Sequence, residues 1–118
     1  MGNKVVHFEI MTKGDAGELH KFYSDIFGWK IDANNPLSYG LIGDDDAGIA
    51  GGIGGITDPN MSGHVTFYVK VPDPEATLQE IEGRGGKRLM GPEEVVPGTT
   101  IALFLDPQGN LVGLSKGE

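Results

Sequence analysis

The sequence predicts an α+β fold made of two copies of one βαβββ module, with helices on one face of each sheet. Three pairs of landmarks recur in nearly constant register, 57 or 58 residues apart: His7 and His64, Asp15 and Asp73, Gly28 and Gly86. Each histidine stands at the start of an alternating apolar run. Each aspartate stands at the start of a helical pattern, and each glycine stands at the end of that pattern. Because one module is too small to bury its own apolar face, both are expected to share a core within one domain of 118 residues.

The first module is predicted over residues 4–54. Residues 5–11 alternate between apolar and polar side chains and therefore predict a strand. Asp15 is expected to cap a helix that ends at Gly28, with Glu18 at the capping-box position. The apolar stripe of this helix consists of Leu19, Phe22, Tyr23, Ile26 and Phe27. Three further strands are expected over residues 29–32, 39–42 and 48–54, with an acidic turn at Asp44–Asp46.

The second module is predicted over residues 64–116, after a linker over residues 55–63. Its first strand covers residues 64–71, and Asp73 is expected to cap its helix, with Pro74 in the first turn, where proline is tolerated. Three strands follow, over residues 87–90, 100–105 and 110–115. The segment Asp106–Asn110 has the composition of a tight turn between the last two.

Composition excludes several classes of protein. The chain has no cysteine, so disulfides, thiolate metal sites and cysteine nucleophiles are excluded, and a cytoplasmic location is expected. A net charge of −8 argues against nucleic-acid binding and favours neutral or cationic ligands. The N-terminus lacks the layout of a signal peptide, and no apolar run is long enough for a membrane helix, so no membrane partner is expected.

The alternation of the two first strands predicts a ligand site. The residues opposite the apolar face are His7, Glu9 and Met11 in the first module and His64, Thr66 and Tyr68 in the second. If the sheets curve around a common space, these side chains line a concave surface of mixed polarity. The alternative is structural: an ion pair for Glu9, ordinary strand packing for Tyr68 and gap filling by Met11. His20, on the polar side of the first helix, is expected to be solvated.

Four segments of the chain resemble the vicinal oxygen chelate superfamily, the group of glyoxalase I, bleomycin-resistance proteins and extradiol dioxygenases. They are VVHFEI, FYSDIFGWKI, GHVTFYVKVPDPE and FLDPQGNLVGL. The resemblance covers nearly the whole chain and implies two βαβββ modules that form an open, eight-stranded cup. In many members this cup holds one divalent metal ion, such as Fe, Mn, Ni or Zn, which chelates two oxygens of the substrate. The resemblance also implies a homodimer.

The residues that would hold the metal match the superfamily only in part. The expected histidines fall at His7 and His64, but the expected acids fall at Gly52 and Gly113. Because glycine supplies no side-chain ligand, the complete set of four ligands cannot form. Glu9 could supply a third ligand, since two histidines and one carboxylate form the site of some iron oxygenases.

Three hypotheses follow. In the first, the chain is a metal-dependent lyase or dioxygenase in which His7 and His64, with Glu9, bind the ion and Tyr68 donates a hydrogen bond to developing charge. In the second, the chain is a metal-free binder of an apolar or cationic small molecule. The residues expected to contact that molecule are Trp29, Tyr68 and Phe104, with Gly52 and Gly113 making room for it. In the third, the chain is a structural or regulatory partner with no working site.

Overall fold

The computed structural model describes residues 2–117, which form two compact units. The N-terminal unit is His7–Val65, and the C-terminal unit combines the described parts of Met1–Val6 and Thr66–Glu118. Along the chain the order of elements is βαβββ twice, apart from one added helical turn. The α+β class and the two repeated modules predicted from the sequence are therefore confirmed.

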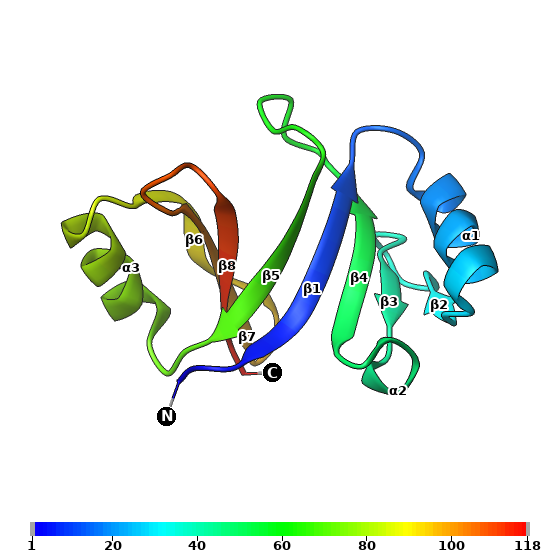
Figure 1. Cartoon of the computed structure of the whole chain (residues 1–118), viewed down its shortest axis with the longest axis horizontal. Coiled ribbons are helices and arrows are strands. Elements are labelled where there is room, and N and C mark those ends of the chain that lie inside the picture. The colour runs from blue at the N-terminus through cyan, green and yellow to red at the C-terminus, as the bar shows by residue number, and fades with distance from the viewer. Residues whose placement is uncertain (1, 118) are drawn as a thin grey trace. The chain divides into compact units, whose positions relative to one another are not determined.

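The first module contains β1 (Val5–Thr12), α1 (Ala16–Phe27), β2 (Ile31–Asp32), β3 (Gly40–Ile42), α2 (Asp44–Ala47) and β4 (Ala50–Gly55). Its strands are ordered β2-β3-β4-β1, with β1 parallel to β4 and the other pairs antiparallel. Helix α1 packs against β4, on one side of this sheet (Figure 1). Ile42 and Ile53, on β3 and β4, are almost completely buried.

The predicted ends of the first helix are confirmed by its caps. The Asp15 carboxylate accepts a hydrogen bond from the backbone N–H of Gly17, at 2.8 Å. Gly28 adopts the left-handed conformation (φ 74°), and its N–H donates to the Ser24 carbonyl at 2.9 Å. The acidic turn expected at residues 44–46 is instead the single helical turn α2. Three aspartates at a helix N-terminus complement the helix dipole, which explains this difference.

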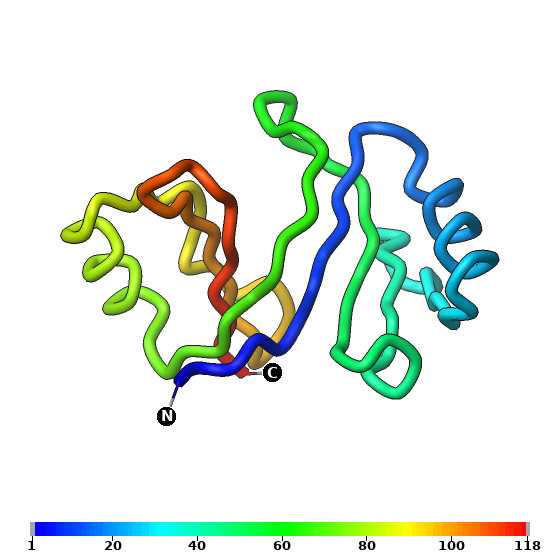
Figure 2. Tube along the Cα trace, in the orientation of Figure 1, coloured from blue at the N-terminus to red at the C-terminus, as the bar shows by residue number. Residues whose placement is uncertain are grey.

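The segment after β4 returns the chain to the end of β1. The N–H of Ile56 donates to the Thr12 carbonyl at 2.9 Å, and Lys13 Nζ donates to the Pro59 carbonyl at 3.1 Å. Figure 2 shows this segment as a loop that rises beyond the end of β1. These contacts hold the predicted linker against the first module.

The second module contains β5 (His64–Lys70), α3 (Pro74–Gly83), β6 (Lys87–Val96), β7 (Thr99–Leu105) and β8 (Leu111–Lys116). Its strands are ordered β5-β8-β7-β6, and β5 is parallel to β8. The first strand of each module thus pairs in parallel with the last strand of the same module. This shared topology is the structural form of the repeat seen in the sequence.

Two predicted boundaries in the second module were wrong. Helix α3 ends at Gly83 rather than beside Gly86, because the Gly86 N–H closes the turn on the Ile81 carbonyl at 2.9 Å and Gly85 has a positive φ. Strand β6 extends to Val96 instead of ending at residue 90. Its pairing with β7 continues past Pro92 through shifts of register, which a sequence pattern does not reveal.

The core of the C-terminal unit lies between α3 and its sheet. Its buried residues are Val71, Leu78, Ala102 and Leu114, and the partly buried Val69, Ile81 and Phe104 pack against them. The apolar face predicted for β5 is only partly covered, since Val65 is 70% exposed and Phe67 41% exposed.

The apolar stripe predicted for α1 is likewise wider than the face that the helix buries. Phe22, Ile26 and Phe27 are each more than half exposed. None of the helices in residues 2–117 combines the length and apolar composition needed to span a bilayer.

A bidentate ion pair joins α3 to β6. The Arg88 guanidinium donates to both carboxylate oxygens of Glu75, at 2.8 and 2.7 Å, and to Glu82 at 3.3 Å. The hydrogen bonds that Glu75 accepts from Arg88, together with one from Gln79, lower the pKa of Glu75 to about 2. This pair therefore links the edge strand to the helix in a charge-dependent way.

The ion pair predicts a pH-dependent difference in melting temperature. Because the pKa of Glu75 is lower in the folded chain than its ordinary value of 4.5, its stabilisation is complete above that value and is lost as the pH falls toward 2. We expect Arg88→Gln to melt below the wild type at about pH 7 and the difference to close between about pH 4.5 and pH 2. Circular dichroism melts across this range measure the effect. A difference that stays constant would contradict it, and Arg84→Gln, which breaks an exposed pair with Glu80, is the matched control.

Candidate functional site

One face of the N-terminal unit carries the polar residues of β1. In the register of β1 and β4, His7 lies beside Ala50, Glu9 beside Gly52 and Met11 beside Gly54. Paired residues project to the same side of a sheet, so the glycines of β4 form the floor next to the polar side chains of β1.

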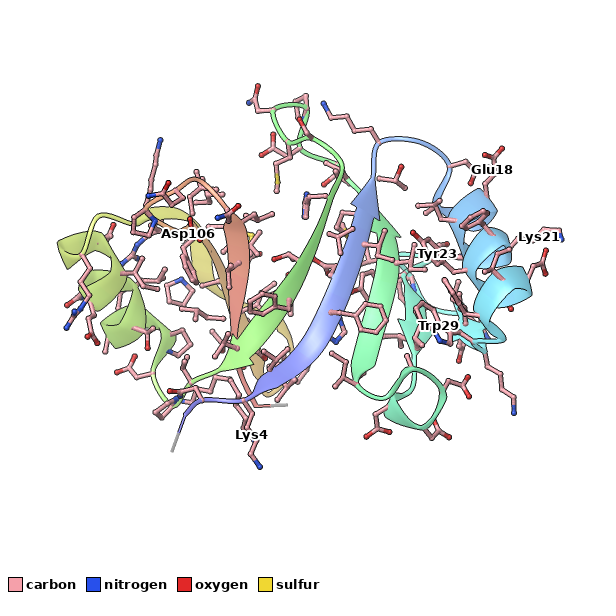
Figure 3. The ribbon with its side chains drawn as sticks, viewed as in Figure 1. Lys4, Glu18, Lys21, Tyr23, Trp29 and Asp106 are labelled. Atoms are coloured by element: carbon pink, nitrogen blue, oxygen red, sulfur yellow. The ribbon has the colours of Figure 1, made fainter. Side chains whose placement is uncertain are left out.

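The opposite face of the same strands packs under α1. Phe8 contacts Trp29, with ring centroids 5.6 Å apart, and Trp29 stacks on Tyr23 at 5.9 Å with a 9° angle between the rings. Figure 3 shows Tyr23 and Trp29 together beside α1, with Lys21 pointing away from the sheet. The structure therefore places Trp29, an expected ligand contact, in an aromatic cluster with Phe8 rather than with Glu9.

Tyr39 connects the two polar residues of β1 that were singled out from the sequence. Its hydroxyl donates a hydrogen bond to Glu9 Oε2 at 2.8 Å and lies 3.0 Å from His7 Nε2. Because the phenol has one hydrogen and gives it to Glu9, Nε2 of His7 must be the donor to the phenol oxygen. His7, Tyr39 and Glu9 thus form a hydrogen-bonded chain, here called the Tyr39 cluster, and all three side chains are partly exposed.

The ring of Tyr39 lies over glycines of β4. A Cβ atom at Gly52 would collide with Cε2, Cζ and Oη of Tyr39, and one at Gly54 would lie 2.7 Å from Cδ1. Met11 Sδ also approaches Gly54, at 3.4 Å from the same position. The space that a side chain at position 52 would occupy is therefore filled by the phenol.

The backbone around Tyr39 is held by its own loop. Asn35 accepts a hydrogen bond from the Tyr39 N–H at 3.0 Å and donates to the Tyr39 carbonyl at 2.7 Å. The residue between them, Ser38, has a φ of 52°, a conformation that non-glycine residues rarely adopt. Tyr39 was expected to begin a strand, and the sequence pattern did not indicate its contacts with His7 and Glu9. The Asn-Asn-Pro sequence at residues 34–36, which is typical of a turn, is the local signal beside it.

His20 was wrongly expected to be solvated. It is partly buried, and its Nε2 donates to the Ile53 carbonyl at 2.8 Å. The side chain also lies over Gly40, where a Cβ would come within 2.6 Å of the same nitrogen. Because α1 packs against β4, this histidine is directed to the sheet and serves to dock the helix.

The second module repeats the arrangement of a tyrosine over a glycine. Tyr68 on β5 lies beside Gly113 on β8, and a Cβ at Gly113 would collide with the Tyr68 ring. Tyr68 is only 4% exposed. Thr66, on the same face of β5, is equally buried and donates its hydroxyl hydrogen to the Leu111 carbonyl at 2.7 Å.

His64 and Phe104 are the remaining site residues expected from the second module. His64 Nδ1 lies 2.9 Å from the Ser62 carbonyl, so this nitrogen carries the hydrogen. Phe104 packs against the core between α3 and the sheet, on the face opposite Tyr68. Ser115, which the sequence did not single out for this face, is completely buried two residues after Gly113.

The arrangement does not fit the complete metal site that the resemblance implies. Both positions expected to hold an acid are glycines, and a tyrosine ring covers each of them. His7 Nε2 is a hydrogen-bond donor to Tyr39, so it would have to lose its proton and this partner before binding an ion. Residues 2–117 contain no group of three or more histidine, aspartate or glutamate side chains arranged to hold a metal.

Comparisons with known proteins agree with this fold. The family model described as the Glyoxalase/Bleomycin resistance protein/Dioxygenase superfamily matches residues 4–114. A "Glyoxylase-like domain-containing protein" of Didymella fabae is 32% identical, over 81% of this chain and 80% of its own.

Solved structures show the same likeness at lower identity. A superfamily member from Vibrio splendidus 12B01 matches with a TM-score of 0.67 and 18% identity, over 98% of this chain and 99% of its own. Methylmalonyl-CoA epimerase from Mycobacterium tuberculosis matches with a TM-score of 0.66 and 13% identity, over 97% of this chain and 87% of its own.

Proposed function

The chain belongs to the Glyoxalase/Bleomycin resistance protein/Dioxygenase superfamily, and from this premise we propose that it binds a small organic molecule without the superfamily's complete metal site. The observation that carries the proposal is the Tyr39 cluster. A phenol fills the place of the missing side chain at position 52 and joins the carboxylate of Glu9 to the imidazole of His7. Glu9, His7 and Tyr39 are partly exposed residues, and their carboxylate, imidazole and phenol supply the few convergent polar groups typical of a ligand site.

The charge of this unit indicates the class of ligand. Within His7–Val65 the sequence has nine carboxylate residues and three lysines. The Glu9 carboxylate attracts positive charge and accepts hydrogen bonds, so it favours a ligand with a cationic group or with an amide or hydroxyl donor. One neighbouring epimerase structure contains methylmalonyl-CoA. That ligand is a polyanion, and we propose a neutral or cationic ligand for this chain instead.

Among the remaining residues expected to contact a ligand, Met11 stays a prediction of this proposal, because it lies on the same face of β1 as Glu9. Thr66, Tyr68 and Gly113 stay expectations from the sequence on which the proposal does not rest, since Thr66 and Tyr68 are each 4% exposed and Tyr68 covers Gly113. Trp29 and Phe104 contribute indirectly, because they support the opposite faces of their sheets.

Thermal-shift measurements with three matched aromatic probes test the proposal. We expect benzyltrimethylammonium and benzyl alcohol to raise the melting temperature through preferential binding to the folded chain, and benzoate to have no effect. Glu9→Gln keeps the shape of the side chain and removes its charge, so it should abolish the preference for the cation. Addition of EDTA should leave these shifts unchanged. A larger shift with benzoate, or loss of the shifts in EDTA, would contradict the proposal.

The second candidate is a metal-dependent lyase or dioxygenase that uses His7 and His64. The observation in its favour is that both residues lie on the first strand of their module, His7 as the third residue of β1 and His64 as the first residue of β5. The homodimer implied by the resemblance remains a prediction for either function.

A further inference from the structure

We infer that Tyr39 is a positioning residue of this ligand site, supplied by a loop to replace the side chain that β4 lacks at Gly52. The inference rests on the proposed function and adds a named residue to it. Tyr39 was not among the residues that the sequence suggested, and its role follows from its contacts in the folded chain.

Tyr39 is held from three directions. Its ring lies on Gly52 and Gly54, its hydroxyl joins Glu9 to His7, and its backbone is bound on both sides by Asn35. A residue in a rare backbone conformation, here Ser38, persists only where surrounding contacts stabilise it. Such conformations are concentrated at functional sites.

The Tyr39 hydroxyl fixes the orientation of two side chains. One hydrogen bond orients the Glu9 carboxylate through Oε2, and the other orients the His7 ring through Nε2–H. Two side chains that would otherwise rotate therefore meet a ligand in one arrangement. Order present before binding reduces the entropy lost on binding, so these contacts strengthen affinity without touching the ligand themselves.

The second module contains a tyrosine with which Tyr39 can be compared. Tyr68 also covers a glycine, Gly113, but it comes from a paired strand and is 4% exposed, as a structural residue would be. Tyr39 comes from a loop and is partly exposed. The comparison distinguishes the positioning tyrosine from the packing tyrosine.

The test separates positioning from folding with an NMR signal. The chain has three histidines, so the imidazole ¹H–¹⁵N spectrum is simple to assign. We expect the His7 Nε2–H proton to be visible in the wild type, because its hydrogen bond slows exchange with water, and to be lost in Tyr39→Phe. Isothermal titration should show benzyltrimethylammonium binding about tenfold more weakly to this variant. Tyr23→Phe, on the opposite face, is the control and should change neither result.

Chemical rescue gives an independent readout. Tyr39→Ala leaves a space over Gly52 and Gly54 that has the shape of a phenol ring. We expect p-cresol to restore the His7 signal in this variant and toluene, which lacks the hydroxyl, to leave it absent. If Tyr39→Phe retains both the His7 signal and the wild-type affinity, the inference is wrong. If the signal behaves as expected but the wild type binds none of the three aromatic probes, the proposed function fails and the arrangement of His7 stands.

Discussion

Replacing Gly52 by alanine is expected to lower the free energy of unfolding by about 1–3 kcal/mol, the range for inserting a methyl group into a packed site. The new Cβ would collide with the ring of Tyr39, and the ring must leave its place on β4. The hydroxyl would then lose its hydrogen bonds with Glu9 and His7. The affinity for the probe should therefore fall together with the free energy of unfolding. Urea denaturation measures the first effect, and the thermal-shift assay with benzyltrimethylammonium measures the second.

The control for this substitution lies on the same strand. A Cβ at Gly55 would meet nothing within 4 Å, so Gly55→Ala should leave both stability and binding close to those of the wild type. Gly113→Ala should destabilise the chain as Gly52→Ala does, because Tyr68 covers that position. Equal stability of the Gly52 and Gly55 variants would show that Tyr39 does not lie on Gly52.

Much of the fold follows from local chemistry that is visible in the sequence. The alternation of β1 separates Glu9 from Phe8, and the structure places them on opposite faces of the sheet. Asp15 and Gly28 end the first helix because one side chain caps its N–H groups and the other residue tolerates a left-handed backbone. The repeat of these signals after residue 63 predicts the second module.

The features that were missed depend on tertiary contacts. Tyr39 reaches Glu9 because the chain turns at Ser38 and Asn35 holds the backbone of Tyr39 in place. His20 points toward the sheet because α1 lies over β4. The pattern of polar residues along the helix does not predict this position. The sequence shows that position 52 has no side chain, but only the structure shows that the ring of Tyr39 fills the space above it.

The metal content of the chain is expected to be far below one ion per chain, even after expression in medium supplemented with iron, manganese, nickel and zinc. Three features of the structure lead to this expectation. Gly52 and Gly113 supply no ligands, tyrosine rings cover both positions, and His7 donates its Nε2 hydrogen to Tyr39.

Elemental analysis of the purified wild type and of His64→Ala is the most direct test of the claim that tyrosines have replaced the acids of the metal site. We expect substoichiometric metal in both proteins and no difference between them. One ion per chain in the wild type, lost in His64→Ala, would contradict the account and establish the metal-dependent alternative.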